Sequence, residues 1–460
     1  MTDLSFLDLE RLQEWVVGQR WFASKSRQVS GFDVLQAVTL REEEPRLVLA
    51  LVAARFPTGA HDLYQLPLGL RRADEGWTEG VIDEAGGWTV YDALVDPVHA
   101  RQLLELIRTS ADAPVDDGAI AFRSANGAAA RALGDEVRPM GVEQSNSSMV
   151  FGDALVLKSF RRLEPGVNPE LELLRFLQSH GFENIAPLAG WYEYEGRLVD
   201  STLGILQGFL AGARDGWELA LEEVGEAPET FLERLGALGE VTGSMHSVLG
   251  SDSGDPAFAP EEPGAEAISL ITATVDEEIE RIFLELPDDD EQLAPIAGRG
   301  QDVRERLSQL SQIGVGGRMI RTHGDYHLGQ VMLTDAGWVV LDFEGEPART
   351  LPERRQKRSP LRDVAGMLRS FAYLASAVEL HGGKPAPDGW EDQARSVFLE
   401  GYFRAVDPSL LPPGQDAIHK LLSVFELEKA VYELQYELNN RPDWVSIPVA
   451  SIERLLEEPE

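Results

Sequence analysis

The segment from Arg321 to Glu346, which reads RTHGDYHLGQVMLTDAGWVVLDFEGE, places the carboxylates of Asp325 and Asp342 and the amide of Gln330 near the ends of apolar runs. Asp325 follows an apolar run and a His-Gly pair, Gln330 comes five residues later, and Asp342 ends a second apolar run. Phosphoryl transfer from a nucleotide needs such a set, because one carboxylate accepts the proton of the attacking hydroxyl while amide and carboxylate oxygens hold Mg²⁺. The pattern predicts Asp325 as the base and Gln330 and Asp342 as metal ligands.

A short hairpin must bring these ligands together. The turn Thr334-Asp335-Ala336-Gly337 between two apolar runs favours a β-hairpin that places Gln330 beside Asp342. The tripeptide His-Gly-Asp alone would more often be an ordinary turn. It is the complete spacing that favours a site.

The composition is that of an ordinary globular protein, with 460 residues, 43% hydrophobic and 26% charged. The formal net charge of −37 would repel nucleic acids and anionic membranes. No apolar run approaches the roughly 20 residues of a membrane span, and the N-terminus shows no export signal. The absence of cysteine agrees with a cytoplasmic protein. Because ATP is itself an anion, the six lysines become candidates for specific tasks.

HGDYHLGQV followed by LDFEGEP resembles the aminoglycoside phosphotransferase and choline kinase superfamily, and within it the bacterial maltokinases. Most superfamily members have Asn where this chain has Gln330, a mild change because both offer a carbonyl oxygen. The triplet Asp342-Phe343-Glu344 stands where protein kinases have Asp-Phe-Gly, which adds the carboxylate of Glu344 to the metal site. The resemblance implies an α+β, two-lobed kinase fold that uses ATP and Mg²⁺.

Residues 120 to about 210 fit an N-terminal kinase lobe. Lys158 closes the strand-like run LVLKSF, where a kinase lysine contacts nucleotide phosphates. Its acidic partner is expected at Glu172, with Glu170 as the alternative. A tight polar turn before it is expected to cover the phosphates, and the strand ending near residue 209 to lead into the adenine-binding hinge. The predicted nucleotide-binding residues are Lys158, Glu172, Ser145, Asn146, Ser147, Ser148, Gln207 and Phe209.

The N-terminal region looks like an added subdomain. A short amphipathic helix over residues 4 to 18 precedes three strand-like stretches between 32 and 68, and RWFASKSRQV is similar to the cap of maltokinases. Residues 113 to 118 read as a linker by composition. We expect a β-rich cap over residues 1–95, an N-terminal kinase lobe over 96–209 and a mostly helical catalytic lobe over 210–460.

The helical C-terminal region is expected to hold the acceptor. Asp363, in the first turn of a helix over 361–380, resembles the aspartate that braces the catalytic loop in the superfamily, whereas His246 reads as an interior histidine. Five cations between residues 354 and 362 could be a solvated face or could contact phosphate or substrate. By resemblance to maltokinases, the acceptor sugar would contact His327, Lys429, Tyr432, Tyr436, Arg441 and Trp444.

The resemblance implies ATP-dependent phosphorylation of maltose to maltose 1-phosphate, for α-glucan or glycogen synthesis, with other glucan-pathway enzymes as partners. An aminosugar kinase of the same fold that acts on glucosamine is the first alternative. A non-catalytic regulatory subunit is the second, and the intact set of Lys158, Asp325, Gln330 and Asp342 argues against it.

Overall fold

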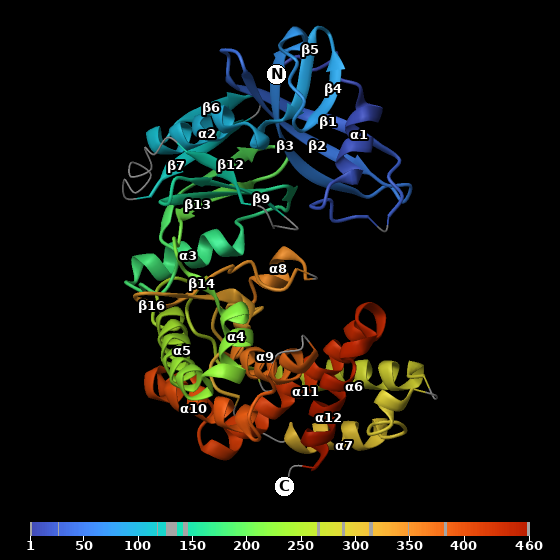
Figure 1. Cartoon of the computed structure of the whole chain (residues 1–460), viewed down its shortest axis with the longest axis vertical. Coiled ribbons are helices and arrows are strands. Elements are labelled where there is room, and N and C mark those ends of the chain that lie inside the picture. The colour runs from blue at the N-terminus through green and yellow to red at the C-terminus, as the bar shows by residue number, and fades with distance from the viewer. Residues whose placement is uncertain are drawn as a thin grey trace. The chain divides into compact units, whose positions relative to one another are not determined.

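The computed structural model describes residues 2–25, 27–116, 118–125, 136–140, 146–264, 267–287, 290–311, 316–347, 349–380 and 384–457. The chain divides into two compact units, which we call unit 1 (Met1–Gln178 and Ala186–Gly212) and unit 2 (Ser179–Ile185 and Ala213–Glu460). The course of the chain is drawn in Figure 1. Within the described ranges, no helix is both long and apolar enough to cross a bilayer.

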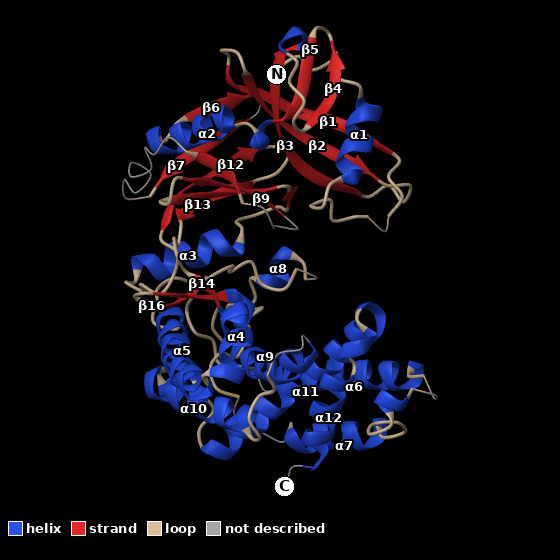
Figure 2. Cartoon of the chain, viewed as in Figure 1, coloured by secondary structure: helices blue, strands red, loops and turns tan. Residues whose placement is uncertain are grey.

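Unit 1 contains two antiparallel sheets, whose strands are red in Figure 2. The first sheet has the order β1-β2-β3-β5-β4, with β11 paired to β3. Its strands are β1 (Gly31–Arg41), β2 (Arg46–Arg55), β3 (His61–Arg72), β4 (Val81–Ala85), β5 (Trp88–Asp92) and β11 (Arg162–Leu163). The second sheet has the order β6-β7-β12-β13-β10-β9-β8. Its strands are β6 (Asp112–Val115), β7 (Gly118–Ser124), β8 (Val137–Pro139), β9 (Asn146–Phe151), β10 (Leu155–Phe160), β12 (Leu188–Gly196) and β13 (Ser201–Gly208).

Three helices accompany these sheets: α1 (Leu9–Gly18), α2 (Pro97–Thr109) and α3 (Pro169–Ser179). Helix α1 begins later than the apolar pattern suggested, because the Asp8 side chain caps it by accepting from the N–H groups of Glu10 and Arg11. The predicted linker is instead a hairpin, in which Ala113 pairs with Ile120 and Val115 with Gly118.

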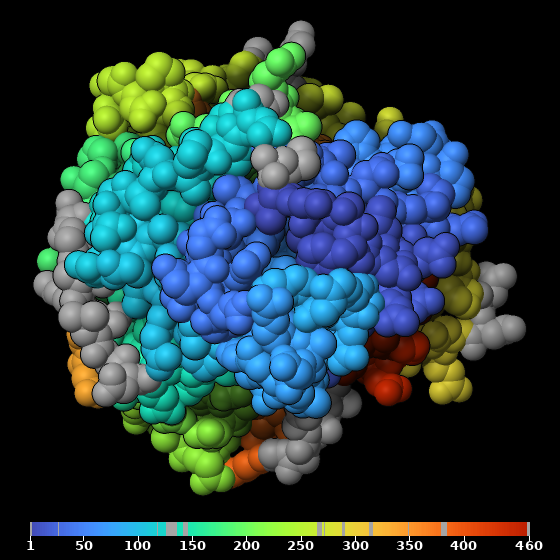
Figure 3. Space-filling view, turned by 90° about the horizontal axis from the view of Figure 1, so that it is seen from above, coloured from blue at the N-terminus to red at the C-terminus, as the bar shows by residue number. Residues whose placement is uncertain are grey.

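Strand β2 explains why the two sheets form one unit. Its near-continuous apolar run is buried on both faces, since alternate side chains point to opposite sides. Val48, Ala50, Val52 and Ala54 enter the core against α1, while Leu47, Leu49 and Leu51 enter the core shared with α2 and the second sheet. Seen from above, the first sheet (blue) lies side by side with the α2 and β6 region (cyan) in Figure 3.

Unit 2 is mostly helical and holds one small sheet of order β14-β15-β16 (Figure 2). Its strands are β14 (Arg214–Asp215), β15 (Val331–Thr334) and β16 (Gly337–Val340). Its helices are α4 (Gly216–Glu226), α5 (Pro228–Leu249), α6 (Ala267–Glu285), α7 (Gly300–Leu310), α8 (Leu351–Arg354), α9 (Leu361–Leu380), α10 (Trp390–Ala405), α11 (Gln415–Asn440) and α12 (Ser446–Glu457). The predicted helix at 361–380 is confirmed.

Candidate active site

The catalytic loop between Thr322 and Gln330 is held by one buried carboxylate. Asp363, in the first turn of α9, accepts from the backbone N–H of His323 at 2.8 Å and from that of Gly324 at 2.9 Å. Its side chain is 2% exposed. The sequence-based prediction that Asp363 braces this loop is confirmed, and the two hydrogen bonds fix the backbone just before Asp325.

A buried histidine supports that carboxylate from behind. His246 Nε2 lies 3.2 Å from Asp363 Oδ2, and His246 Nδ1 lies 3.1 Å from the hydroxyl of Tyr402. Burial alone would raise the pKa of Asp363, but hydrogen bonding and charge from His246, the nearby His323 and the Gly324 N–H outweigh it and hold that pKa below its usual value. Asp363 is therefore a carboxylate at neutral pH, and His246 is the interior histidine that the sequence predicts.

His323 links the loop to the strand that carries the acids, a role that sequence reasoning missed. The Asp325 N–H donates to His323 Nδ1 at 3.3 Å, and His323 Nε2 lies 2.8 Å from the carbonyl oxygen of Leu341. Since Nδ1 accepts, the ring proton sits on Nε2 and donates to that carbonyl. The His323 ring therefore connects the backbone of Asp325 to that of Leu341, the residue before Asp342. The only signal in the sequence was a histidine two residues before the aspartate.

The far side of the loop packs against helices α5 and α9. The Tyr326 hydroxyl lies 2.8 Å from Thr242 Oγ1, and burial raises the pKa of this tyrosine well above its usual value. Gly366 on α9 lets the helix backbone lie close to the loop, because a Cβ at this position would lie 2.7 Å from the carbonyl oxygen of Tyr326. The loop thus rests directly on the α9 backbone and points Asp325 outward.

The predicted hairpin is confirmed and sets the acids beside the amide. Strands β15 and β16 pair from Val331 with Val340 to Thr334 with Gly337, and Gly337 has a positive φ of 117°. Beyond the last pair, the Leu341 N–H donates to the Gln330 carbonyl at 2.9 Å. Gln330 and Asp342 therefore flank one end of the hairpin.

Asp342 has the left-handed backbone conformation, with φ of 56°, which a non-glycine residue adopts only when its surroundings impose it. Phe343 is buried and packs its ring 5.0 Å from that of His323. Carboxylate oxygens of Asp342 and Glu344 lie within 4.8 Å of each other. The strained turn between them directs two acids to one place, and all donors here are the oxygen ligands that Mg²⁺ prefers.

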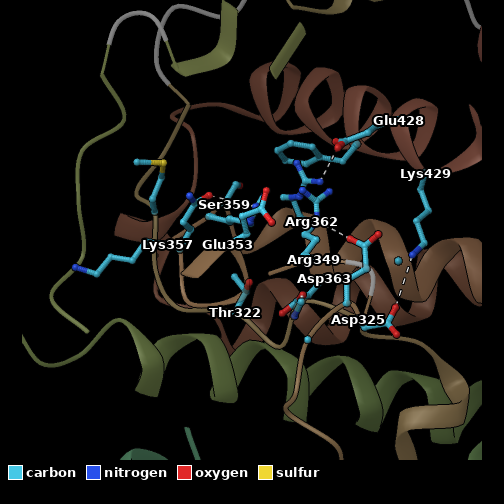
Figure 4. Close-up of a pocket in the computed structure, with 18 of the residues that line it drawn as sticks. Thr322, Asp325, Arg349, Glu353, Lys357, Ser359, Arg362, Asp363, Glu428 and Lys429 are labelled. Carbon is cyan, nitrogen blue, oxygen red and sulfur yellow. Dashed lines mark hydrogen bonds and ion pairs between the residues drawn. The ribbon is translucent and has the colours of Figure 1, made fainter. Parts of the chain in front are cut away.

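A cavity of about 590 Å³ in unit 2 is lined in part by Asp325. Asp325 is one-quarter exposed, and Lys429 on α11 brings its Nζ to 3.7 Å from Asp325 Oδ1, the contact dashed in Figure 4. His327 Nε2 lies 4.0 Å from the other carboxylate oxygen. The charged residues on the cavity lining are Glu278, Asp325, Glu346, Glu353, Asp363, Glu428, Arg349, Arg354, Lys357, Arg358, Arg362 and Lys429. They comprise six acids and six bases, in contrast to the acidic chain as a whole.

The predicted acceptor residues separate into two groups. Lys429 and Tyr432 line the cavity, with the Lys429 ammonium 5.8 Å from the Tyr432 ring centre. Tyr436, Arg441 and Trp444 instead form a cluster beyond it, where the Arg441 guanidinium lies 5.4 Å and 5.0 Å from the two aromatic rings. Arg441 also makes a two-fold contact with Glu437 at 2.7 and 2.9 Å. Among the predicted acceptor residues, His327 and Lys429 approach the Asp325 carboxylate to 4.0 and 3.7 Å, and Tyr432 lines the cavity beside Lys429.

In unit 1, Lys158 on β10 pairs with Glu170, and the expectation that favoured Glu172 is corrected. Lys158 Nζ lies 2.9 Å from Glu170 Oε2, with the two side chains 12% and 3% exposed. The Asn168 side chain accepts from the Glu170 N–H at 2.8 Å, which places Glu170 in the first turn of α3.

The polar residues before Lys158 are only partly a turn. Asn146, Ser147 and Ser148 begin strand β9, while Ser145 lies outside the described residues. Ser148 pairs directly with Lys158 across the sheet, so these two side chains share a face. Ser147 belongs to the opposite face, where its hydroxyl accepts from Arg161 Nε at 2.8 Å. The hydroxyl on the lysine face is therefore that of Ser148.

The predicted hinge residues lie at the end of β13. Gln207 is 8% exposed and pairs with Val156 on one side and Leu188 on the other. The Phe209 N–H donates to the carbonyl oxygen of Ala154 at 2.9 Å. Because this N–H is hydrogen-bonded to Ala154, Phe209 could contact the adenine of a nucleotide only through its carbonyl or its side chain.

Comparison with known proteins identifies two regions of the chain. Residues 15–96 match the maltokinase N-terminal cap domain, and residues 136–346 match the phosphotransferase enzyme family. The cap and the superfamily predicted from RWFASKSRQV and HGDYHLGQV are confirmed.

Glucosamine kinases are among the similar proteins. The chain is 28% identical over 331 residues to glucosamine kinase of Streptacidiphilus jiangxiensis, covering 69% of this chain and 73% of that protein. It is 27% identical over 339 residues to glucosamine kinase of Mycolicibacterium smegmatis (strain ATCC 700084 / mc(2)155), covering 70% and 80%.

A solved structure shares the fold over nearly the full length. Glucosamine kinase in complex with glucosamine, ADP and inorganic phosphate superposes with a TM-score of 0.70 at 21% identity, covering 96% of this chain and 98% of that chain. The predicted α+β kinase-like fold with a β-rich N-terminal part is confirmed. The chain is thus an enzyme whose residues 136–346 match the phosphotransferase enzyme family and whose residues 15–96 match the maltokinase N-terminal cap domain.

Proposed function

We propose that this protein transfers the γ-phosphate of ATP to a sugar hydroxyl, and that the acceptor is maltose, giving maltose 1-phosphate for α-glucan synthesis. The observation that carries the proposal is the geometry around Asp325. A braced loop presents this carboxylate to a cavity, while a hairpin holds Gln330 and Asp342 at the loop's other end.

Asp325 would orient the acceptor hydroxyl and take its proton as the sugar oxygen bonds to the γ-phosphorus, while the bond from that phosphorus to the bridging oxygen breaks and ADP leaves. Its backbone N–H is tied to His323, and its carboxylate faces the Lys429 ammonium at 3.7 Å. Lys429 is also placed to donate to a sugar oxygen, and the adjacent Tyr432 ring, 39% exposed, offers an apolar face to a pyranose.

The ligand set of unit 2 fits Mg²⁺. Gln330, Asp342 and Glu344 can each supply an oxygen ligand. The strained turn at Asp342 sets the carboxylates of Asp342 and Glu344 within 4.8 Å of each other. These three residues would hold the ion, which supplies charge neutralisation for the phosphates when bound.

In unit 1, Lys158 would contact the nucleotide phosphates. The buried Glu170 holds its ammonium by a 2.9 Å ion pair, which orients the lysine at little conformational cost. Ser148, on the same face of the sheet, and the backbone of Asn146 and Ser147 are the accompanying phosphate donors. Gln207 and Phe209, at the end of β13, would contact the adenine of the nucleotide.

Three acids on the lining of the acceptor cavity already face a cation, which favours a neutral sugar. Asp325 faces Lys429, Glu346 pairs with Arg349 at 2.6 Å and Glu428 pairs with Arg362 at 2.6 Å. The ammonium of an aminosugar would have to bind Glu278 or Glu353, which also line the cavity. The match to the maltokinase cap domain also supports maltose. Glucosamine is the second candidate, because the similar curated proteins are named glucosamine kinases.

A sugar panel tests the proposal. Purified protein with ATP and Mg²⁺ is offered maltose, glucose and glucosamine, and ATP consumption and phosphosugar formation are measured. We expect turnover on maltose well above the other sugars, and a loss of at least about a thousandfold in kcat for Asp325→Asn. Turnover on glucosamine with none on maltose would overturn the acceptor assignment. An Asp325→Asn variant as active as the parent would overturn the assigned base.

A further inference from the structure

The acceptor cavity has a strongly cationic wall. Although the chain carries a net charge of −37, the segment from Arg349 to Arg362 contributes five bases to the cavity lining. They are Arg349, Arg354, Lys357, Arg358 and Arg362. The lining as a whole has equal numbers of acids and bases, so an anionic ligand would be favoured only at a base on this wall that no carboxylate neutralises.

Most of these bases already have a partner. Arg349 Nε lies 2.6 Å from Glu346, Arg362 Nη2 lies 2.6 Å from Glu428, and Lys357 Nζ lies 2.6 Å from Glu261. Arg358 differs from them. Its Nη2 donates to the neutral side chain of Gln356 at 3.3 Å, and it forms no ion pair with any carboxylate in the part of the chain that the structure describes.

The backbone of Arg358 is fixed. Its N–H donates to the Ile320 carbonyl at 2.8 Å, and its own carbonyl accepts from the Ile320 N–H at 2.9 Å. Ile320 stands two residues before Thr322, where the catalytic loop begins. The guanidinium is therefore carried by backbone that is bonded to the same segment that carries Asp325.

The surroundings of Arg358 disfavour its own charge. Burial, followed by repulsion from Arg362 and Arg349, lowers the pKa of Arg358 to about 10, while Glu428 and Glu346 act more weakly in the opposite direction. The group is still a cation at neutral pH. An anion placed among the three guanidinium groups would offset both the burial and the repulsion.

We propose that Arg358, with Arg349 and Arg362 beside it, forms an oxyanion subsite that takes the phosphate of a phosphorylated sugar or free inorganic phosphate. The planar donors of guanidinium groups match two oxygens of a phosphate at once, which a neutral hydroxyl cannot exploit. Arg362 is drawn with Glu428 in Figure 4, and Lys429 reaches Asp325 in the same cavity. Phosphate bound here competes with the acceptor sugar for space.

The test measures binding directly. The nucleotide-free, metal-free protein is titrated by calorimetry at fixed ionic strength with inorganic phosphate and, separately, with α-glucose 1-phosphate. We expect saturable binding that Arg358→Gln weakens roughly tenfold or more, as for the loss of one charged contact, and that Arg358→Lys retains in part. The control is Arg404→Gln, since this arginine is 65% exposed, pairs with Glu240 on the surface and does not line the cavity.

The two ligands distinguish the source of the phosphate. Tighter binding of the phosphosugar identifies a phosphorylated sugar as the occupant, and equal binding identifies the phosphate group alone. No binding to the parent protein, or equal binding to an Arg358→Gln variant with unchanged circular dichroism, would overturn the subsite. The subsite is independent of the acceptor assignment. Phosphate binding lost in Arg358→Gln, together with no turnover on any sugar, would leave it standing and remove the proposed reaction.

Discussion

Replacing Asp363 by asparagine tests how the catalytic loop is held. The buried Asp363 carboxylate accepts two backbone N–H groups, that of His323 at 2.8 Å and the part-buried one of Gly324 at 2.9 Å, and it faces His246 at 3.2 Å. Asparagine keeps the shape but offers one acceptor oxygen, so its amide group must face a donor. One buried N–H loses its acceptor, which costs about 1–3 kcal/mol, and the loss of the charge facing His246 brings the total to about 2–4 kcal/mol.

Asp363→Asn should lower kcat by more than its effect on the free energy of unfolding would suggest. The two N–H groups belong to residues directly before Asp325, so a shift of the loop by about 1 Å moves the base and lowers kcat by roughly a hundredfold. The assay combines urea unfolding followed by fluorescence with steady-state kinetics on the best sugar. Asp255→Asn is the matched control, because Asp255 accepts from the N–H of Ala257 at 2.8 Å on the exposed surface. We expect that control to change unfolding by less than about 1 kcal/mol. Equal effects of the two substitutions on both the unfolding midpoint and kcat would refute the bracing role.

Three further predictions follow from specific contacts. Gly366→Ala should lower kcat and destabilise the protein, because the new Cβ would lie 2.7 Å from the carbonyl oxygen of Tyr326. In its control, Gly236→Ala, the new Cβ has its nearest contact at 3.7 Å, so this substitution should stabilise the helix by about 0.5–1 kcal/mol, as measured by thermal unfolding. Glu170→Gln should raise the KM for ATP several-fold more than Glu172→Gln, since the structure pairs Lys158 with Glu170, and the reverse order would restore the original assignment. Burial lowers the pKa of His99 from 6.5 to about 4, so the unfolded chain binds its proton first as the pH falls. About 3 kcal/mol of stability should be lost between pH 6.5 and 4, and an unchanged pH profile of unfolding in His99→Gln would contradict this.

The sequence was most informative where chemistry depends on residue type and short spacing. Asp325, Gln330 and Asp342 stand on one loop and one hairpin, and the turn ending in Gly337 closes as its sequence suggests. Neighbours in the chain can be placed by local rules, because a two-residue hairpin fixes register within a few residues.

Local rules were less reliable where packing decides the outcome. Residues 113–118 have linker composition but form a hairpin at the edge of the second sheet, since pairing with β7 satisfies their backbone. Glu170 and Glu172 are equal in sequence terms, and only the docking of α3 selects Glu170 for Lys158. Ser147 and Ser148 differ only in the face of β9 that each occupies.

What the sequence by itself determined was the class of chemistry, carried by carboxylates, an amide and a lysine whose types and local spacing suit nucleotide-dependent phosphoryl transfer. Only the tertiary structure decided that Asp363, 38 residues beyond the base, holds the loop, that Lys429 faces Asp325, and that Arg358 stands without a carboxylate partner among the described residues. The reason is physical. Contacts between distant segments depend on how helices pack around a buried core, and no local pattern of residues encodes which side chains that packing will leave face to face.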